Sequence, residues 1–330
     1  MEKGEDLPHK NLVLSVYIIT FVAGVPANIL ALVAFTRKVR QKPTPIDIFL
    51  LNLTVSDLVF LFFLPFRMKE AADDMAWDMP YFLCPLSGFL FYTTIYNSTF
   101  FLTAVSAERY LGVAFPIKYK LRRRPLYAAA ACVLFWAVSM AHCSIVYIMQ
   151  YFQPANGSLV KPHERSTCYV EFSPAQLEVL LPVRLELFLV LFCVPFLVCC
   201  FCYVNFIRIL SRMPSISRPK RQRAIGMALG TLLVFVLCFG PYNVSHVVGF
   251  VHWRSPRWRV YALLFSTFNA CLDPLIFYFS SSAVRGMLRG VARGAFGWLH
   301  RPCAGSKARC YPHVACLVTE ESTQCSNETS

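Results

Sequence analysis

The chain has 330 residues, of which 56% are hydrophobic and only 15% are charged. This apolar share is well above that of an ordinary soluble domain and indicates a membrane protein. The formal net charge of +14 would also suit a nucleic-acid-binding protein. The basic residues, however, fall in short links between apolar segments, so we expect no nucleic-acid partner.

Segments long enough to cross a bilayer, which takes about 20 residues of helix, recur along the whole chain. There are seven of them: 12–35, 46–66, 82–103, 126–147, 179–209, 224–250 and 260–279. The first is too long for the core of a signal peptide and has no small-residue cleavage site, so we expect it to be retained. The sequence therefore predicts an all-α membrane protein, a seven-transmembrane helix bundle.

The links between these segments differ in charge. The links after the first, third and fifth segments are rich in Lys and Arg, whereas the link after the second carries mainly Asp. Basic links mark the cytoplasmic side of a membrane protein. We therefore expect an extracellular N-terminus (1–11), a seven-transmembrane domain (12–280), a cytoplasmic C-terminus and a place in the plasma membrane.

The region after the last span has a pattern of its own. Arg285, Arg289 and Arg293 recur every four residues beside apolar side chains. This spacing predicts a short amphipathic helix over 281–299 that lies on the lipids of the inner leaflet, although several glycines weaken it. A cytoplasmic tail (300–330) follows.

Three kinds of covalent modification are suggested by residue position. Cys84 and Cys168 alone among the 14 cysteines fall in the outer layer, where the environment permits a disulfide. Asn156 begins an Asn-Gly-Ser glycosylation acceptor in the longest outer link. Cys303, just beyond the amphipathic stretch, is either palmitoylated or a plain reduced thiol.

Basic side chains at the outer ends of three spans suggest an anion site. Arg184, His246 and Arg259 lie at comparable depth in the fifth, sixth and seventh spans, and an arginine matches a carboxylate bidentately. Tyr92 and Tyr96, four residues apart on one helix face, could line such a site. The alternatives are arginines that only extend to the membrane surface and tyrosines that only pack.

Acidic and polar residues deeper in the spans suggest a cation site. Asp57, Ser98, Asn269 and Asp273 supply oxygen ligands of the kind that a hard cation such as sodium requires. The alternative is a hydrogen-bonded network in which one carboxylate is protonated. No other metal or cofactor is expected.

Charged residues also occur at the cytoplasmic end of the third span and near the outer end of the fifth span. Glu108, Arg109 and Tyr110 close the third span at its cytoplasmic edge, either as an interfacial ion pair or as a latch that opens to present the arginine to a partner. Glu186 follows Arg184 by two residues and so points about 200° away around the helix, which leaves its partner open.

The order and spacing of several motifs resemble the rhodopsin-like G-protein-coupled receptors. The motifs are Asn28, "LNLTVSD" ending at Asp57, Cys84, "ERY" from Glu108, Trp136, Pro195, "CFGPY" from Cys238 and "DPLIFY" from Asp273. Two departures are Phe239, where the family usually has Trp, and Asp273, where it usually has Asn. The first puts the aromatic toggle of the sixth span in doubt, and the second adds a carboxylate to the sodium pocket.

Within that family the stretches "LPVRLEL", "CFGPYNVSHVVG" and "FYFSSS" resemble the free fatty acid receptors for short-chain fatty acids. The segment 108–127 is nearer to subtype 2, which we expect, whereas "LCPLSGF" and "TTIY" are nearer to subtype 3. The resemblance implies activation by acetate, propionate or butyrate, and signalling through heterotrimeric G proteins of the Gi and Gq types, with arrestin as a further partner.

The resemblance also implies roles for the residues singled out above. Arg184, His246 and Arg259 would bind the carboxylate, Tyr92 and Tyr96 would line the pocket, and Cys84 would pair with Cys168. A sodium ion would lie among Asp57, Ser98, Asn269 and Asp273. Residues implied in activation and G-protein coupling are Glu108, Arg109, Tyr110, Pro241 and Tyr278.

Other functions are also considered. A receptor for another small anionic metabolite would use the same basic residues. A carboxylate transporter or channel would need a continuous polar path, but the inner halves of the spans offer only Asp57 and Asp273. A retinal photoreceptor is disfavoured because the seventh span has no Lys for a Schiff base. No zinc motif or nucleophile triad points to an enzyme.

Overall fold

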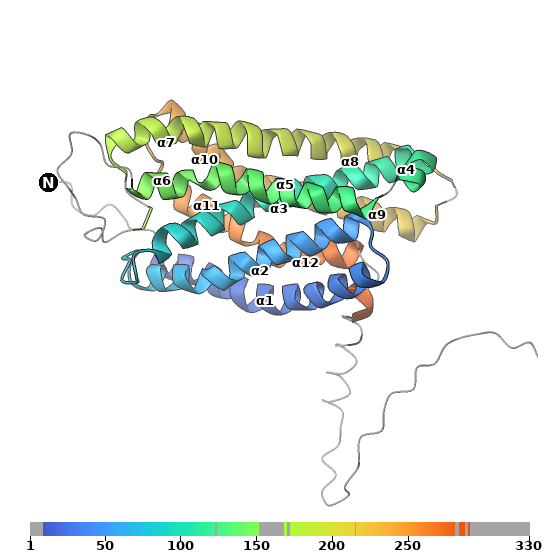
Figure 1. Cartoon of the computed structure of the whole chain (residues 1–330), viewed down its shortest axis with the longest axis horizontal. Coiled ribbons are helices and arrows are strands. Elements are labelled where there is room, and N and C mark those ends of the chain that lie inside the picture. The colour runs from blue at the N-terminus through green and yellow to red at the C-terminus, as the bar shows by residue number, and fades with distance from the viewer. Residues whose placement is uncertain are drawn as a thin grey trace, which may run out of the picture. The chain divides into compact units, whose positions relative to one another are not determined.

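The computed structural model describes residues 9–122, 124–151, 168–169, 172–214, 216–280, 284–287 and 290. The chain divides into one unit over 1–290 and another over 291–330, and the second lies outside the described residues. All regular structure in the described part is helical, and Figure 1 shows its helices side by side in one bundle.

The helices follow the order of the predicted spans. They are α1 (Lys10–Gln41), α2 (Pro45–Ala72), α3 (Leu83–Ala114), α4 (Pro116–Arg122), α5 (Pro125–Cys143), α6 (Ile145–Tyr151), α7 (Pro174–Glu186), the π-helical η2 (Leu187–Cys193), α8 (Val194–Arg212), α9 (Arg218–Val234), the π-helical η3 (Phe235–Phe239), α10 (Gly240–Val251), α11 (Arg259–Thr267) and α12 (Asn269–Ser280). All seven predicted apolar segments are thus helical.

Several passes through the bundle are made of more than one helix. The fourth pass joins α5 to α6, the fifth joins α7, η2 and α8, the sixth joins α9, η3 and α10, and the seventh joins α11 to α12. The two π-helical segments are each followed by a proline, Pro195 and Pro241, in the first turn of the next helix. Proline lacks an amide hydrogen and clashes with the carbonyl one turn back, so a wider turn at this position relieves the conflict.

By length and apolar composition, five helical stretches of the described chain are able to cross a membrane: Lys10–Gln41, Pro45–Ala72, Pro125–Tyr151, Pro174–Arg212 and Arg218–Val251. The other two passes fail this criterion for separate reasons. α3 has many polar residues in its interior, among them Thr93, Asn97 and Thr99. The seventh pass is divided at Phe268 into two short helices.

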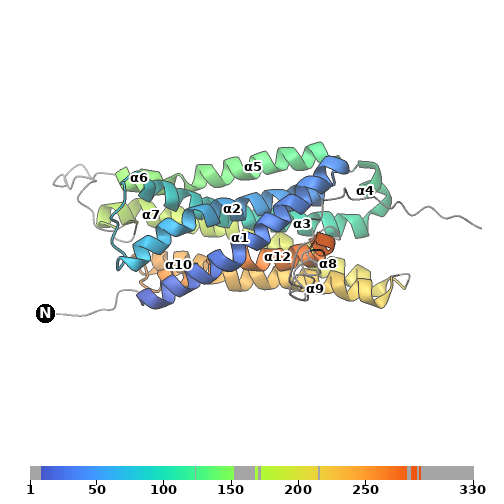
Figure 2. The same ribbon diagram turned by 90° about the horizontal axis from the view of Figure 1, so that it is seen from below.

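Helix α3 lies in the centre of the bundle, against α2, α5 and α8, and Figure 2 shows α1 and α2 along one side of it. Polar side chains also connect helices inside the bundle. The amide of Asn28 on α1 donates to the backbone oxygen of Ala270 on α12 at 2.8 Å. Such bonds between membrane helices contribute modestly to stability, about 0.6 kcal/mol each on average, and help to set which helix faces meet.

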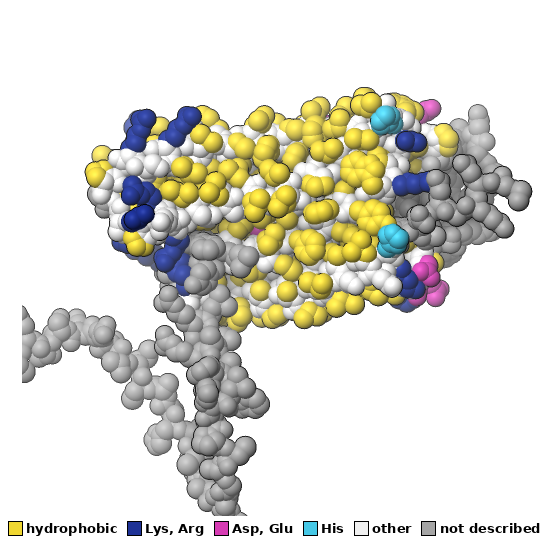
Figure 3. Space-filling model, turned by 180° about the vertical axis from the view of Figure 1, so that it is seen from behind, with side chains coloured by type: hydrophobic (Ala, Val, Ile, Leu, Met, Phe, Trp, Pro, Cys, Tyr) yellow, Lys and Arg dark blue, Asp and Glu magenta, His cyan; other side chains and the backbone are white. Residues whose placement is uncertain are grey.

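The surface shows the charge pattern that the sequence predicts. On the face seen in Figure 3, hydrophobic side chains form a band across the middle, and Lys and Arg gather at one end. Acidic side chains accompany the basic ones at the other end. That mixed end carries the disulfide between Cys84 and Cys168 and is called the disulfide end below; the end with Lys and Arg is called the basic end.

The predicted amphipathic helix over 281–299 lies mostly outside the described residues. Val284, Met287 and Gly290 belong to its described part, and they are helical. The helix as a whole stays a prediction.

Candidate functional site

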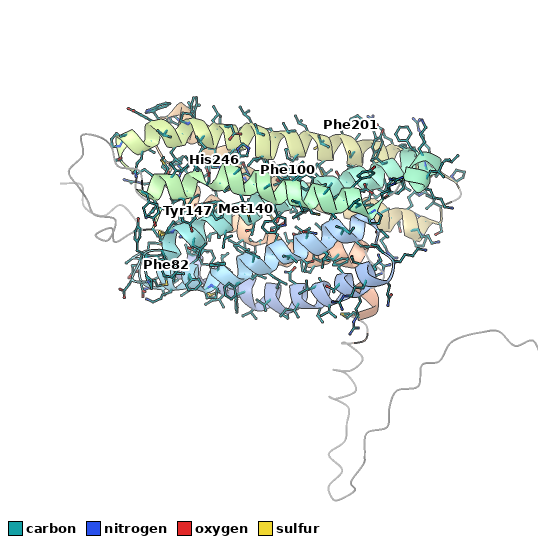
Figure 4. The ribbon with its side chains drawn as sticks, viewed as in Figure 1. Phe82, Phe100, Met140, Tyr147, Phe201 and His246 are labelled. Atoms are coloured by element: carbon teal, nitrogen blue, oxygen red, sulfur yellow. A yellow bond between two sulfur atoms is a disulfide. The ribbon has the colours of Figure 1, made fainter. Side chains whose placement is uncertain are left out.

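Three basic side chains from different helices meet inside the disulfide end of the bundle. Arg184 comes from α7, His246 from α10, and Arg259 is the first residue of α11. Their exposed fractions are 2%, 1% and 9%, and Figure 4 shows the labelled His246 among the helices toward this end. The structure thus brings together the three residues that the sequence singled out, and we call them the basic cluster.

Hydrogen bonds fix the orientation of two members of this cluster. Arg259 Nη1 lies 3.0 Å from Nδ1 of His246, and Arg259 Nη2 donates to the hydroxyl of Tyr242 at 2.6 Å. Because a guanidinium nitrogen can only donate, Nδ1 of His246 must accept. The imidazole is therefore neutral and carries its proton on Nε2, which lies 3.1 Å from the hydroxyl of Tyr96.

Arg184 has a different environment. Its Nη1 donates to the hydroxyl of Ser255 at 3.3 Å, while its Nε is buried without a partner among the described residues. Its guanidinium lies 4.9 Å from the ring centroid of Phe172 and 5.9 Å from that of Tyr169. Arg184 is therefore held mainly through aromatic faces, which leaves hydrogen-bonding capacity unused.

An aromatic wall connects the two arginines. Tyr92 stacks on Tyr242 with ring centroids 5.8 Å apart and contacts Tyr169 at 5.7 Å. The ring of Tyr242 in turn lies 4.7 Å from the guanidinium of Arg259. Tyr92 and Tyr96, which the sequence proposed as lining residues, are thus both at the cluster. Tyr242 is one helical turn before His246, so its spacing could have indicated the same face.

The disulfide holds part of this wall in place. Cys84 and Cys168 are bonded with their Cα atoms 5.7 Å apart, which confirms the predicted pair. The bond fastens the loop residue Tyr169 beside the start of α3. Burial raises the pKa of the Tyr169 phenol above its usual value, so its hydroxyl stays protonated at physiological pH.

Within the described part of the chain, the positive charge of the basic cluster is not balanced by an acidic side chain. The ion pairs among the described residues include neither Arg184 nor Arg259. Two buried guanidinium groups without a carboxylate are costly, because burial removes their hydration and leaves like charges close together. A small anion between them would relieve this cost.

Glu186 does not supply that anion. Its Oε2 lies 3.1 Å from Nδ1 of His142 on α5, and both side chains are partly exposed on the outside of the bundle. The acid therefore faces away from Arg184, as its position on the helix predicts.

A second polar site lies deeper in the bundle. Asn269 donates to Oδ2 of Asp273 at 2.9 Å, and Ser98 donates to the backbone oxygen of Thr94 at 3.0 Å. Oδ2 of Asp57, Oδ1 of Asp273 and Oδ1 of Asn269 are buried acceptors without a partner in the described chain. A cavity of about 10 Å³ lined by Asp57, Ser98 and Asn269 has room for about one water molecule or ion.

Unpaired oxygen atoms around a cavity of this size fit a hard cation such as sodium. The predicted residues Asp57, Ser98, Asn269 and Asp273 would hold it: the first three line the cavity, and Asp273 is bonded to Asn269 beside it. Groups of three or more His, Cys, Asp or Glu side chains that could hold a transition metal are absent from the part of the chain that the structure describes.

Three of the predicted coupling residues, Glu108, Arg109 and Tyr110, lie at the basic end. Glu108 accepts a hydrogen bond from the hydroxyl of Tyr119 on α4, and the ion pairs found among the described residues do not include Glu108 with Arg109. Tyr110 packs against Phe115 and Phe201. Phe239 is fully buried at the end of η3, two residues before Pro241.

Some predicted residues cannot be placed. Asn156 and Cys303 lie outside the described residues, and so does the side chain of Tyr278. Four residues that contact the basic cluster were not indicated by the sequence: Tyr169, Phe172, Tyr242 and Ser255.

Comparison with known proteins gives consistent matches over most of the chain. The family model described as 7 transmembrane receptor (rhodopsin family) matches residues 27–277. Free fatty acid receptor 3 of Mus musculus is 53% identical over 271 residues, which cover 82% of this chain and 83% of that protein. Free fatty acid receptor 2 of Rattus norvegicus is 53% identical over 278 residues, 84% of either chain. Free fatty acid receptor 2 of Homo sapiens is 50% identical over 285 residues, 86% of this chain and 85% of that one. Because subtypes 2 and 3 match equally well, nearness to subtype 2 stays a prediction.

Proposed function

Because the chain belongs to the rhodopsin family of seven-transmembrane receptors, and within it to the free fatty acid receptors, we propose that short-chain carboxylates activate it. Acetate, propionate and butyrate are the candidate ligands. The protein is a multi-pass membrane receptor and not an enzyme. The N-terminus is outside and the C-terminus is cytoplasmic in this proposal, which the charge pattern of the links supports.

The observation that carries the proposal is that no carboxylate of the described residues pairs with Arg184 or Arg259. Arg259 is oriented by His246 and Tyr242, whereas the Nε of Arg184 has no hydrogen-bond partner among the described residues. A carboxylate can accept from both guanidinium groups at once, and burial strengthens such charge-assisted bonds. The aromatic wall around them limits the space for the rest of the ligand.

The small size of the ligand places an upper limit on its affinity. The best small ligands gain no more than about 1.5 kcal/mol per heavy atom. Propionate has five heavy atoms, so its binding free energy is at most about 7.5 kcal/mol, which corresponds to a Kd of a few micromolar or weaker. A receptor of this kind responds to carboxylates at micromolar to millimolar concentration.

Signalling through G proteins of the Gi and Gq types is the second part of the proposal, with arrestin as a further partner. Support comes from Glu108, Arg109 and Tyr110 at the basic end and from the π-helical segment before Pro241 in the sixth pass. A ligand that binds one conformation more tightly shifts the equilibrium toward it, and a tenfold preference supplies about 1.4 kcal/mol.

A sodium ion at Asp57, Ser98, Asn269 and Asp273 is the third part. The unpaired oxygens and the small cavity support it. The chain's own contribution is to keep these oxygens buried at one place between α2, α3 and α12, where an ion would hold the helices together.

The test is a dose-response series of straight-chain carboxylates with one to eight carbons. Cells that express the receptor report calcium and cyclic AMP separately, and untransfected cells are the control. We expect acids of two to four carbons to be the most potent. A response to long chains alone would exclude the short-chain proposal, and equal responses to unrelated small anions would favour a receptor for another anionic metabolite.

A further inference from the structure

A cavity at the basic end of the bundle is not used by any function described so far. Its volume is about 610 Å³, in the range of small-molecule sites, and it lies between α2, α3, α4 and the start of α5. Figures 1 and 2 show α4 at this end, far along the bundle from α6 and α7 of the disulfide end. It is therefore separate from the basic cluster.

The walls of the cavity are mostly apolar. Phe49 contributes a buried ring from α2, while Leu111 and Phe115 at the end of α3 are 39% and 48% exposed. On α5 the wall is formed by Ala128 and Ala131, and their small side chains leave the groove open. An open apolar groove suits a hydrocarbon chain.

Two cations complete the lining. Lys118 and Arg124 both line the cavity and are exposed, and neither belongs to the ion pairs of the described residues. One acid, Glu108, lines the cavity as well, but its carboxylate accepts the hydrogen bond from Tyr119. The cavity thus joins an apolar groove to a pair of unneutralised positive charges.

The exposed side of α5 next to the cavity indicates that a ligand could enter from the membrane. On α5 Leu126, Val133 and Leu134 are 73%, 71% and 59% exposed, as expected of a helix that faces lipid. The cations lie at the end where Lys and Arg gather, and basic pockets between helices on the cytoplasmic side attract acidic head groups. A lipid in the adjacent leaflet can reach the groove from the side.

We propose that this cavity binds an acidic phospholipid of the inner leaflet, with its phosphate at Lys118 and Arg124 and one acyl chain between Phe49 and Ala131. The second acyl chain stays in the bilayer.

Such a lipid would lie beside Glu108, one of the predicted coupling residues. Tyr119 and Glu108 line the same cavity, and their hydrogen bond keeps the carboxylate directed toward α4 and not toward Arg109. A lipid that holds α4 in place would preserve this arrangement, so the composition of the inner leaflet would bias the conformation of the Glu108–Tyr110 edge.

The test measures lipid retained by the purified full-length receptor. Receptor is equilibrated with equal amounts of phosphatidylserine and phosphatidylcholine, and native mass spectrometry counts each adduct. Each basic residue near an acidic head group is worth about a fivefold preference, so Lys118→Gln with Arg124→Gln is expected to lower the preference for phosphatidylserine about thirtyfold. The matched control, Arg212→Gln with Lys220→Gln, removes two exposed cations of the same end that do not line the cavity, and should keep the preference.

A further variant separates a site from general surface charge. Ala131→Phe keeps both cations but fills the groove, and should also lose the retained phosphatidylserine. Its fold is checked by its melting temperature in phosphatidylcholine alone, and Leu111→Ser serves in its place if that temperature falls. Equal retention of both lipids by the wild type, a cation variant that retains phosphatidylserine, or a folded groove variant that retains it would each overturn the proposal.

Discussion

Arg184 and Arg259 are both buried, but each guanidinium is held by a different kind of partner. Arg259 bonds to His246 and to the hydroxyl of Tyr242. Among the described residues, Arg184 forms a longer bond to Ser255 and faces the rings of Phe172 and Tyr169. Arg259 is thus oriented by hydrogen bonds within the protein. Arg184 has more donors left to bind a carboxylate.

Glu186 gives a prediction at the residue scale. Its carboxylate is 3.1 Å from His142 and not part of the basic cluster. Glu186→Gln keeps a hydrogen-bonding group at this position, so it should change the half-maximal concentration of propionate less than about twofold, well under the factor of ten that 1.4 kcal/mol would give. A dose-response curve, normalised to surface expression, checks this. A large gain in potency would mean that Glu186 competes with the ligand for Arg184.

The sequence was sufficient to predict the charged residues of the site but not their hydrogen-bond partners. Equal depth in three spans was enough to group Arg184, His246 and Arg259, because helices in a bilayer share a common axis direction. His142, the partner of Glu186, is 44 residues away on another helix, and no spacing along the chain reveals such a pair.

Cys168, Tyr169 and Phe172, in the link before α7, lie beside the basic cluster. The disulfide joins residues 84 apart in the sequence, and the rings of Tyr169 and Phe172 pack edge to face at 4.9 Å. These rings could not be placed from the sequence, because a loop's position depends on the closure of the whole bundle beneath it.

Removal of one ring should weaken ligand binding without changing the fold. Phe172→Leu keeps an apolar side chain but removes the aromatic face over Arg184, a contact worth about 1 kcal/mol. We expect about a fivefold higher half-maximal concentration of propionate. Phe265→Leu, which changes an exposed ring on α11, is the matched control. If both variants respond like the wild type, Phe172 does not help to hold Arg184 for the ligand.

At the scale of the whole molecule, charge is arranged in three layers: a basic cluster inside the disulfide end, a pocket of acids in the middle, and exposed cations at the basic end. The lengths of the apolar segments predicted all seven passes, because bilayer thickness fixes helix length. The π-helical segments before Pro195 and Pro241 escaped prediction because a count of apolar residues does not register a wider turn, and the break at Phe268 escaped it because the break depends on how neighbouring helices pack.

The middle layer leads to a prediction for sodium. If an ion is held by Asp57 and Asp273, the purified receptor should melt at a higher temperature in sodium chloride than in choline chloride of equal ionic strength. Asp57→Asn should remove most of that difference, and Asp78→Asn, on an exposed loop, should retain it. Identical melting temperatures of the wild type in the two salts would leave the pocket as a purely hydrogen-bonded network.

The central claim is that Arg184 and Arg259 bind the carboxylate. It is tested most directly by propionate dose-response curves of Arg184→Ala and Arg259→Ala, compared with Arg254→Ala, which removes an exposed arginine near the same end. Loss of a buried charged bond costs about 2–5 kcal/mol, so both cluster variants should lose at least about thirtyfold in potency at unchanged surface expression, while Arg254→Ala responds normally. A wild-type curve from either cluster variant would contradict the assignment of the site.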